Sequence, residues 1–134
     1  MTTDEMQEYF PAVYPKMFVG KYGGVACGAG WFNILNQLCQ NIQSHIDWKN
    51  SKEEVVAQVT IAQIKEKFGS LRFYYDGGDD YISGMVTLAE SMSGVTCEDC
   101  GDVGVHRNGG WIRTLCDTHE EERKQRMKKY EQTL

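Results

Sequence analysis

Four side chains able to bind a metal lie in two pairs near the C-terminus. Two residues separate Cys97 from Cys100, two separate Cys116 from His119, and fifteen separate the pairs. Two donors at this short spacing can reach one ion from a tight turn, and zinc takes four sulfur and nitrogen ligands tetrahedrally. Four protein ligands leave no position for a reactive water. We therefore expect one structural Zn²⁺ ion held by these residues.

The cysteine count favours a metal site over disulfides. The chain has five cysteines, an odd number, and it begins MTTDEMQEYF, without a basic region or an apolar signal core. Disulfide frameworks are typical of secreted proteins, whereas reduced thiols in this pattern favour metal binding. We expect a cytoplasmic protein in which Cys27 is a loop thiol and Cys39 a small core residue.

The residues around the four ligands predict a treble-clef zinc finger. Gly101 suits the tight turn after the first pair, and residues 103–106 and 111–115 read as short strands across an Asn-Gly-Gly turn. From Cys116 onward the pattern is helical, with glutamates in the first turns and basic residues later, as the helix dipole prefers. A metal-binding turn (the knuckle, residues 97–101), a β-hairpin and a helix therefore follow one another in the order of a treble clef.

A catalytic role for this region is not favoured. His106 and Asn108 resemble the histidine and asparagine of the HNH nucleases, but a general-base histidine there needs a second metal with its own ligands. Asn108 follows His106 by only two residues, and His119 is needed for zinc. We expect His106 to be an exposed strand residue and the protein not to be an enzyme.

The composition is close to the average for globular proteins. Of 134 residues, 41% are hydrophobic and 25% charged. The uncharged segment 22–46 is rich in Gly, Asn and Gln, which excludes a membrane span. The net charge is −5, with seven basic and eleven acidic residues before Cys97 and seven and eight from there on. Non-specific binding to nucleic acid through counterion release is therefore not favoured overall.

The body before the finger begins with a glycine-rich segment and a helix. Apolar residues recur at helical spacing from Trp31 to Ile46, with Asn, Gln and Ser opposite, which predicts a core-facing helix. The preceding residues 21–30, KYGGVACGAG, could cradle a phosphate at the helix N-terminus. They lack the lysine and hydroxyl of a P-loop, so a turn is the favoured interpretation.

Residues 55–76 predict a β-hairpin. Apolar residues alternate from Val55 to Ile61 and again from Leu71 to Tyr75, on either side of a Gly69-Ser70 turn. The alternation slips between Ile61 and Ile64, which indicates a bulge. Basic and aromatic residues near the turn could stack on single-stranded bases, although a solvated hairpin face is more typical.

A third element is a helix from Asp79 or Asp80 to Gly94. Its predicted apolar face consists of Tyr81, Ile82, Met85, Leu88, Ala89 and Met92. The expected fold class is α+β. We expect residues 1–95 to form a body of helix, β-hairpin and helix, and residues 96–134 a zinc-finger module with a C-terminal helix.

Three segments together resemble a known family. They are GWFNILNQLC (30–39), QIKEKFGSLRFYY (63–75) and the pair CEDCG and GGWIRTLCDTH of the finger. The same segments occur in the same order in a group of small, mostly uncharacterised phage and prophage proteins. The resemblance covers roughly residues 20–120. It implies the zinc site given above and a phage accessory protein made in the bacterial cytoplasm, but no reaction or catalytic residue.

The function expected first is non-enzymatic binding to a bacterial protein that is thereby modulated or inhibited. The resemblance supports this expectation because small phage accessory proteins often block host factors, including defence systems. Tryptophan and arginine are typical interface anchors. For Trp111, however, packing of the finger against the body is favoured over partner contact. The expected partner-binding residues are Lys65, Lys67, Arg72, Arg107, Trp111 and Arg113.

The alternative function is nucleic-acid binding by the zinc finger. It would use Arg107 and Arg113 together with the basic stretch of the C-terminal helix, and the affinity would fall steeply with salt. The basic residues of that stretch are Arg123, Lys124, Arg126, Lys128 and Lys129.

Overall fold

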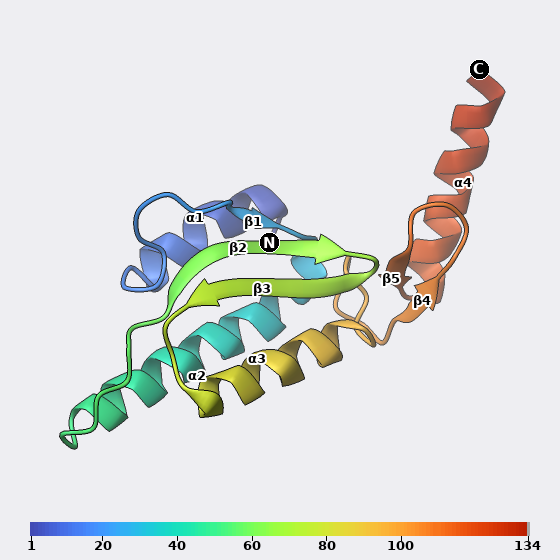
Figure 1. The fold of residues 1–134 in the computed structure, drawn as a ribbon. Coiled ribbons are helices and arrows are strands. Elements are labelled where there is room, and N and C mark those ends of the chain that lie inside the picture. Colours follow the sequence, from blue (N-terminus) through green and yellow to red (C-terminus); the bar gives the residue numbers. More distant parts are fainter. Residues whose placement is uncertain (134) are drawn as a thin grey trace.

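A computed structural model describes residues 1–133 and confirms the α+β class (Figure 1). The elements in chain order are α1 (Thr3–Val13), β1 (Val25–Ala26), the 3-10 turn η1 (Ala29–Trp31), α2 (Phe32–Asn50), β2 (Thr60–Lys67), β3 (Ser70–Asp76), α3 (Asp80–Ser93), β4 (Val105–Arg107), β5 (Arg113–Leu115) and α4 (Asp117–Thr133). Among these residues, no helix is both long and apolar enough to cross a membrane.

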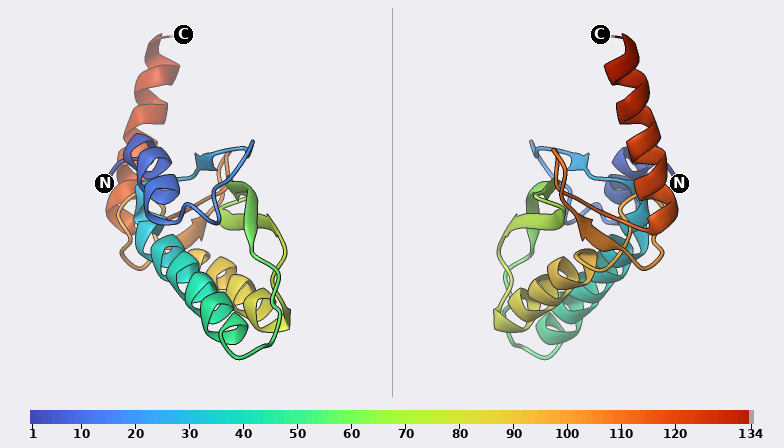
Figure 2. Two further views of the ribbon diagram at one scale, coloured as in Figure 1. Left: turned by 90° about the vertical axis from the view of Figure 1, so that its left-hand side faces the viewer. Right: turned by 90° about the vertical axis from the view of Figure 1, so that its right-hand side faces the viewer.

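A three-stranded sheet in the order β1-β2-β3 forms one layer of the body. Strand β1 pairs in parallel with β2, and β2 pairs antiparallel with β3. Helices α2 and α3 lie side by side across one face of this sheet, and α4 extends away from the body at the finger end (Figures 1 and 2). The core fills the space between sheet and helices, with Trp31, Leu35, Ile64 and Leu71 fully buried.

Helix α1 and strand β1 were not expected from the sequence. Met6 and Phe10, four apart on α1, are fully buried. Thr2 caps the helix by accepting a hydrogen bond from the Glu5 N–H. The side chain of Gln7 hydrogen-bonds both the N–H and the carbonyl of Val25. A polar side chain thus takes the place of a fourth strand at the outer edge of β1.

The hairpin is shorter than its alternating pattern predicts. Strand β2 begins at Thr60, and Val55 is 94% exposed, so the expected strand over residues 55–59 is wrong. The bulge is confirmed: the register shifts between Ile61 and Gln63. Because of that shift Ile61 and Ile64 both face the core, although their positions differ by three and a regular strand would place them on opposite faces.

The hairpin turn is one residue earlier than predicted. The residues between β2 and β3 are Phe68 and Gly69, and both are left-handed, with φ of 53° and 82°. A two-residue turn of this hand matches the twist of the flanking strands. Glycine adopts the conformation freely, but phenylalanine does so at a cost on the order of 1 kcal/mol.

The bounds of α3 are confirmed, but its buried face is only partly the predicted one. Asp79 caps the helix through the Ile82 N–H, and Gly94 follows its last residue. Ile82 and Ala89 are buried as expected, together with Val86, which was not predicted. Leu88 is 63% exposed, because α3 carries two apolar stripes and the sheet covers only one. Tyr81 and Met92 are exposed as well, whereas Met85 is half-buried against the core.

Candidate metal centre and its attachment to the body

The four predicted ligands come together in space. One donor atom from each of Cys97, Cys100, Cys116 and His119 lies within 4.8 Å of all the others. The Cys100 and Cys116 sulfurs are 3.8 Å apart, and the Cys97 sulfur is 3.7 Å from His119 Nδ1. Sulfur atoms bound tetrahedrally at 2.3 Å from one zinc ion would be separated by about 3.8 Å. The cluster is therefore consistent with a bound metal ion.

Local structure supplies each donor. The first two ligands lie in a turn that Gly101 completes at a φ of 86°. Strands β4 and β5 pair antiparallel after it, Cys116 follows β5 directly, and His119 occupies the first turn of α4. This is the predicted order of knuckle, hairpin and helix. Of the four residues, Cys97 is buried, Cys116 and His119 are half-buried and Cys100 is exposed.

The surroundings favour the metal-binding thiolate form of Cys97 but not that of Cys100. The Asp102 N–H acts to lower the pKa of the Cys100 thiol, whereas burial and the neighbouring Cys97 and Cys116 thiols raise it to about 12. Burial acts to raise the pKa of the Cys97 thiol, but hydrogen bonds with nearby backbone groups outweigh it and leave that pKa below its ordinary value. The N–H groups of Asp102 and His119 approach the Cys100 and Cys116 sulfurs at 3.5 Å and 3.4 Å. His119 Nε2, the ring atom outside the cluster, lies 3.8 Å from a Glu122 carboxylate oxygen, a typical outer partner of a metal-bound histidine.

The knuckle packs against the glycine-rich segment that precedes α2. The Gly30 N–H donates to the Glu98 carbonyl at 2.7 Å. A Cβ at Gly30 would meet the Cys97 carbonyl oxygen at 2.2 Å, and one at Gly28 would meet the Glu98 carbonyl oxygen at 2.4 Å. Only glycine permits this approach of two backbones. The favoured interpretation as a turn is only partly right, because the segment also contains strand β1, and its docking role was not indicated by the sequence.

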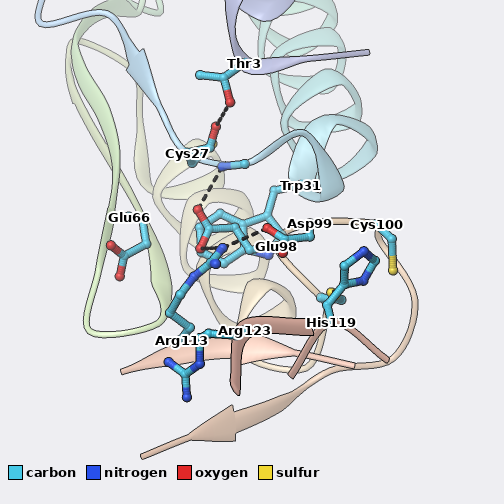
Figure 3. Close-up of polar contacts among 12 residues, drawn as sticks. Thr3, Cys27, Trp31, Glu66, Glu98, Asp99, Cys100, Arg113, His119 and Arg123 are labelled. Carbon is cyan, nitrogen blue, oxygen red and sulfur yellow. Dashed lines mark hydrogen bonds and ion pairs between the residues drawn. The ribbon is translucent and has the colours of Figure 1, made fainter. Parts of the chain in front are cut away.

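Glu98 is a functional residue that the sequence analysis missed. Its carboxylate is almost fully buried and accepts a hydrogen bond from the Gly28 N–H at 2.8 Å (Figure 3). Arg113 lies 3.3 Å from Glu98 and 2.8 Å from Asp99. Burial raises the pKa of Glu98, and both Gly28 and Arg113 oppose that rise. A carboxylate directly after a ligand cysteine therefore joins the knuckle to the body and to β5.

Two further contacts fix the finger against the body. The indole N–H of Trp31, a buried residue at the start of α2, donates to the Thr96 carbonyl at 2.9 Å. The Thr114 hydroxyl of β5 donates to the Gly69 carbonyl in the hairpin turn at 2.5 Å. The finger is thereby held at both the helical layer and the sheet. The division of the chain between residues 95 and 96 stays a prediction.

Two of the six predicted partner-binding residues have partners inside the finger. Arg107 donates to the Leu115 carbonyl and pairs with Asp117 at 2.7 Å. Arg113 is shared between two acidic side chains, as described above. These contacts give both arginines a structural role, and their part in partner binding stays a prediction.

The other four predicted residues lie close to the hairpin turn. Lys65 and Arg72 are opposite each other on β2 and β3, and Lys67 precedes the turn. Trp111 is 73% exposed, so the expectation that its ring packs between finger and body is wrong. Its indole N–H instead donates to Glu66 at 3.3 Å across a hollow that Phe68 also lines. Most of the Trp111 ring is therefore open to solvent.

One basic residue of the α4 stretch is engaged in contacts within the chain, and the others are exposed. Arg123 is buried: it pairs with Glu120 at 2.8 Å and donates to the Trp111 carbonyl at 2.6 Å. It therefore supports the loop between β4 and β5. The remaining basic residues of the stretch, Lys124, Arg126, Lys128 and Lys129, are exposed. His106 is an exposed residue of β4, as predicted.

The fold and this cluster define an α+β protein with a C-terminal Cys₃His site that could hold a metal. No protein-family model, curated protein or solved structure matches the chain.

Proposed function

We propose that this is a non-enzymatic protein that binds an acidic surface of another protein through the tip of the body. The tip surface is defined as Lys65, Lys67, Phe68, Arg72 and Trp111. The resemblance to phage proteins supports a bacterial protein as the partner, with modulation or inhibition as the result. The metal in this proposal is a structural Zn²⁺.

The pairing of Lys65 with Arg72 carries the proposal. These two cations are direct cross-strand neighbours. Like charges in that position destabilise a sheet. Within residues 1–133, neither they nor Lys67 forms an ion pair with an acidic side chain of the chain. Acidic groups on a partner would relieve this repulsion. A partner's carboxylate therefore gains more from binding at this pair than it would from binding at one isolated surface cation.

The two aromatic residues of the tip surface supply apolar contact area. Phe68 is 65% exposed and occupies a left-handed turn position that other residues would fill with less strain. With Trp111 it borders a hollow of about 360 Å³. Exposed, rigidly mounted aromatic rings beside cations are typical interface hot spots.

The zinc finger holds half of this surface in place. Trp111 belongs to the β4–β5 loop, and Phe68 to the β2–β3 turn. The contacts of Thr114 with Gly69 and of Arg123 with the Trp111 carbonyl fix the two loops relative to each other. A structural metal thus contributes to binding by ordering the finger, without taking part in a reaction.

The test is a pull-down from bacterial lysate with the tagged full-length chain, in the presence and absence of nuclease. We expect a stoichiometric protein that resists nuclease. The double variant Lys65→Glu/Arg72→Glu should lose it. The control Lys128→Glu/Lys129→Glu makes the same change of net charge on α4 and should retain it. Capture by the wild type of no stoichiometric protein, or equal capture by both variants, would contradict the proposal.

The same experiment separates the alternative of nucleic-acid binding. Three of the arginines expected to contact nucleic acid, Arg107, Arg113 and Arg123, form ion pairs within the chain. The four exposed cations of α4 are then the candidate contacts with nucleic acid. If nucleic acid co-purifies without a protein, and the α4 control variant loses it, the basic helix is the binding element. Affinity should then fall steeply with salt.

A further inference from the structure

Helices α2 and α3 each carry a second stripe of mainly apolar residues that the sheet does not cover. The spacing alternates between four and three residues, the pattern of a seam between packed helices. The stripes are Ile34, Leu38, Asn41, His45 and Trp48 on α2, and Tyr81, Met85, Leu88 and Met92 on α3. Leu38 is already buried in the core, and Ile34 and Met85 are half-buried against it. The exposed apolar surface of the stripes comes mainly from Trp48, Tyr81, Leu88 and Met92.

The two stripes face each other across a groove. The helices run antiparallel (Figure 1): His45, in the later half of α2, lies 2.7 Å from Asp79 and stacks on Tyr81 at the start of α3. Residues of both stripes line a hollow of about 370 Å³, among them Ile34, Leu38 and Met85. With Leu88 63% exposed, this groove leaves apolar surface open to solvent that the fold itself does not use.

The residues that line this hollow are all uncharged, in a chain that is otherwise rich in charge. Charged groups lie only beyond it, where Asp79 is beside His45 and where Lys49 and Lys52 lie over the Trp48 ring. Neither residues 32–46 of α2 nor residues 81–89 of α3 include an Asp, Glu, Lys or Arg, although 25% of the chain is charged. Exposed helices normally carry charged residues on their outer faces. Depletion of charge around an apolar centre is the composition of a protein interface.

We propose that a second copy of this chain covers the groove. Two antiparallel helix pairs, packed stripe to stripe about a twofold axis, complete a four-helix bundle. Each helix then buries one apolar stripe against its own sheet and the other in the bundle. This surface is separate from the tip surface, so the proposal does not depend on the proposed function.

The chain itself favours a second copy over its other segments as the occupant. Helix α4 is charged along its described length, and α1 already buries Met6 and Phe10 in the body. Two chains with a net charge of −5 repel each other, and an uncharged face is where they can meet without opposed carboxylates. The same face is apolar on both copies and therefore complements itself.

The area agrees with a weak but specific dimer. From Ile34 to Trp48 the stripe is about 20 Å long, and two helices are about 20 Å across. Each copy would bury on the order of 500 Å², which places the interface at the small end of specific contacts. Dissociation is accordingly expected at micromolar concentrations.

The test is sedimentation velocity of the full-length, metal-loaded chain from about 1 to 200 µM, a range chosen around micromolar dissociation. We expect a monomer–dimer equilibrium. Leu88→Glu, which places a carboxylate in the groove at an exposed position, should weaken dimerisation at least about 30-fold. Val55→Glu makes the same charge change at an exposed loop residue and should leave the equilibrium unchanged. Circular dichroism of both variants verifies that the monomer is folded.

A spectroscopic readout locates the interface. In a Trp111→Phe background the remaining indoles are the buried Trp31 and the groove residue Trp48. Dimerisation should shift the emission of Trp48 to shorter wavelength over the same concentration range. A wild-type chain that stays monomeric at about 200 µM, or a dimer that Leu88→Glu does not weaken, would overturn the proposal. A foreign helix would then be the remaining occupant to consider.

Discussion

The carboxylate of Glu98 accepts a hydrogen bond from the Gly28 N–H at 2.8 Å, although the two are seventy positions apart in sequence. This bond joins the metal-binding knuckle to the glycine-rich segment before α2. Glu98 also lies beside Arg113 of β5. One side chain therefore links the body, the knuckle and the finger hairpin, and the orientation of the candidate metal centre depends on it.

Replacing Glu98 by alanine should destabilise the protein by about 3 kcal/mol. The change leaves the Gly28 N–H and part of the Arg113 charge without a partner in a buried setting. Denaturant unfolding of the metal-loaded chain measures the effect. Glu54→Ala, which removes an exposed carboxylate paired with Lys49, is the control and should cost less than about 1 kcal/mol. Equal losses in the two variants would show that Glu98 does not anchor the finger.

Gly30→Ala should disrupt the docking of the knuckle. The new methyl group would meet the Cys97 carbonyl oxygen at 2.2 Å, so one backbone has to move. We expect a loss of several kcal/mol, about 3 or more, in the free energy of unfolding. At Gly84 a Cβ meets no atom within 4 Å, and Gly84→Ala on α3 should keep or raise stability by up to about 1 kcal/mol. A stable Gly30→Ala variant would contradict the observed backbone approach.

The candidate metal centre predicts one zinc ion per chain. Cys97→Ser should abolish stoichiometric zinc binding and the ordered structure of the finger, because metal binding there is coupled to folding. Cys27→Ala, at a buried cysteine outside the cluster, should retain one ion per chain. Elemental analysis gives the zinc content, and circular dichroism before and after chelation follows α4. An ion content that is the same in both variants would exclude the site.

Stability should fall at alkaline pH because of Cys27. Burial raises the pKa of this thiol from 9.0 to about 12, so the folded protein holds a proton that the unfolded chain releases. The contribution of Cys27 is complete below pH 9.0 and decreases as the pH rises toward 12. By about pH 10.5 the loss from this residue is about 2 kcal/mol.

Unfolding free energies of wild type and Cys27→Ala, measured at several pH values from about 8 to 10.5, isolate this effect. The variant should show a shallower alkaline decline, whatever its stability at neutral pH. Parallel pH profiles for the two proteins would mean that the Cys27 thiol does not titrate differently in the folded state.

The features that the sequence predicted correctly are those that depend on neighbouring residues. The spacing of Cys97, Cys100, Cys116 and His119 is enough to bring their donor atoms together, because short loops and one helical turn set their geometry. The start of α3 followed from a cap, Asp79, and its end from Gly94. The bulge in β2 was visible as a slip in alternation.

What the sequence determined by itself, then, is the α+β class, the ligand set of the candidate metal centre and the approximate bounds of α2, α3 and β3. The tertiary structure alone decided which apolar stripe of α3 is buried, because both stripes are mainly apolar and the position of the sheet selects the one with Ile82, Val86 and Ala89. It also decided that the knuckle packs against Gly28 and Gly30 and that Arg113 pairs with Glu98, since these contacts join residues that are not neighbours in sequence. The pattern of neighbouring residues does not predict contacts of this kind. The exposure of Trp111 has the same cause: Arg123 and Glu66 hold its loop from outside the hairpin to which it belongs.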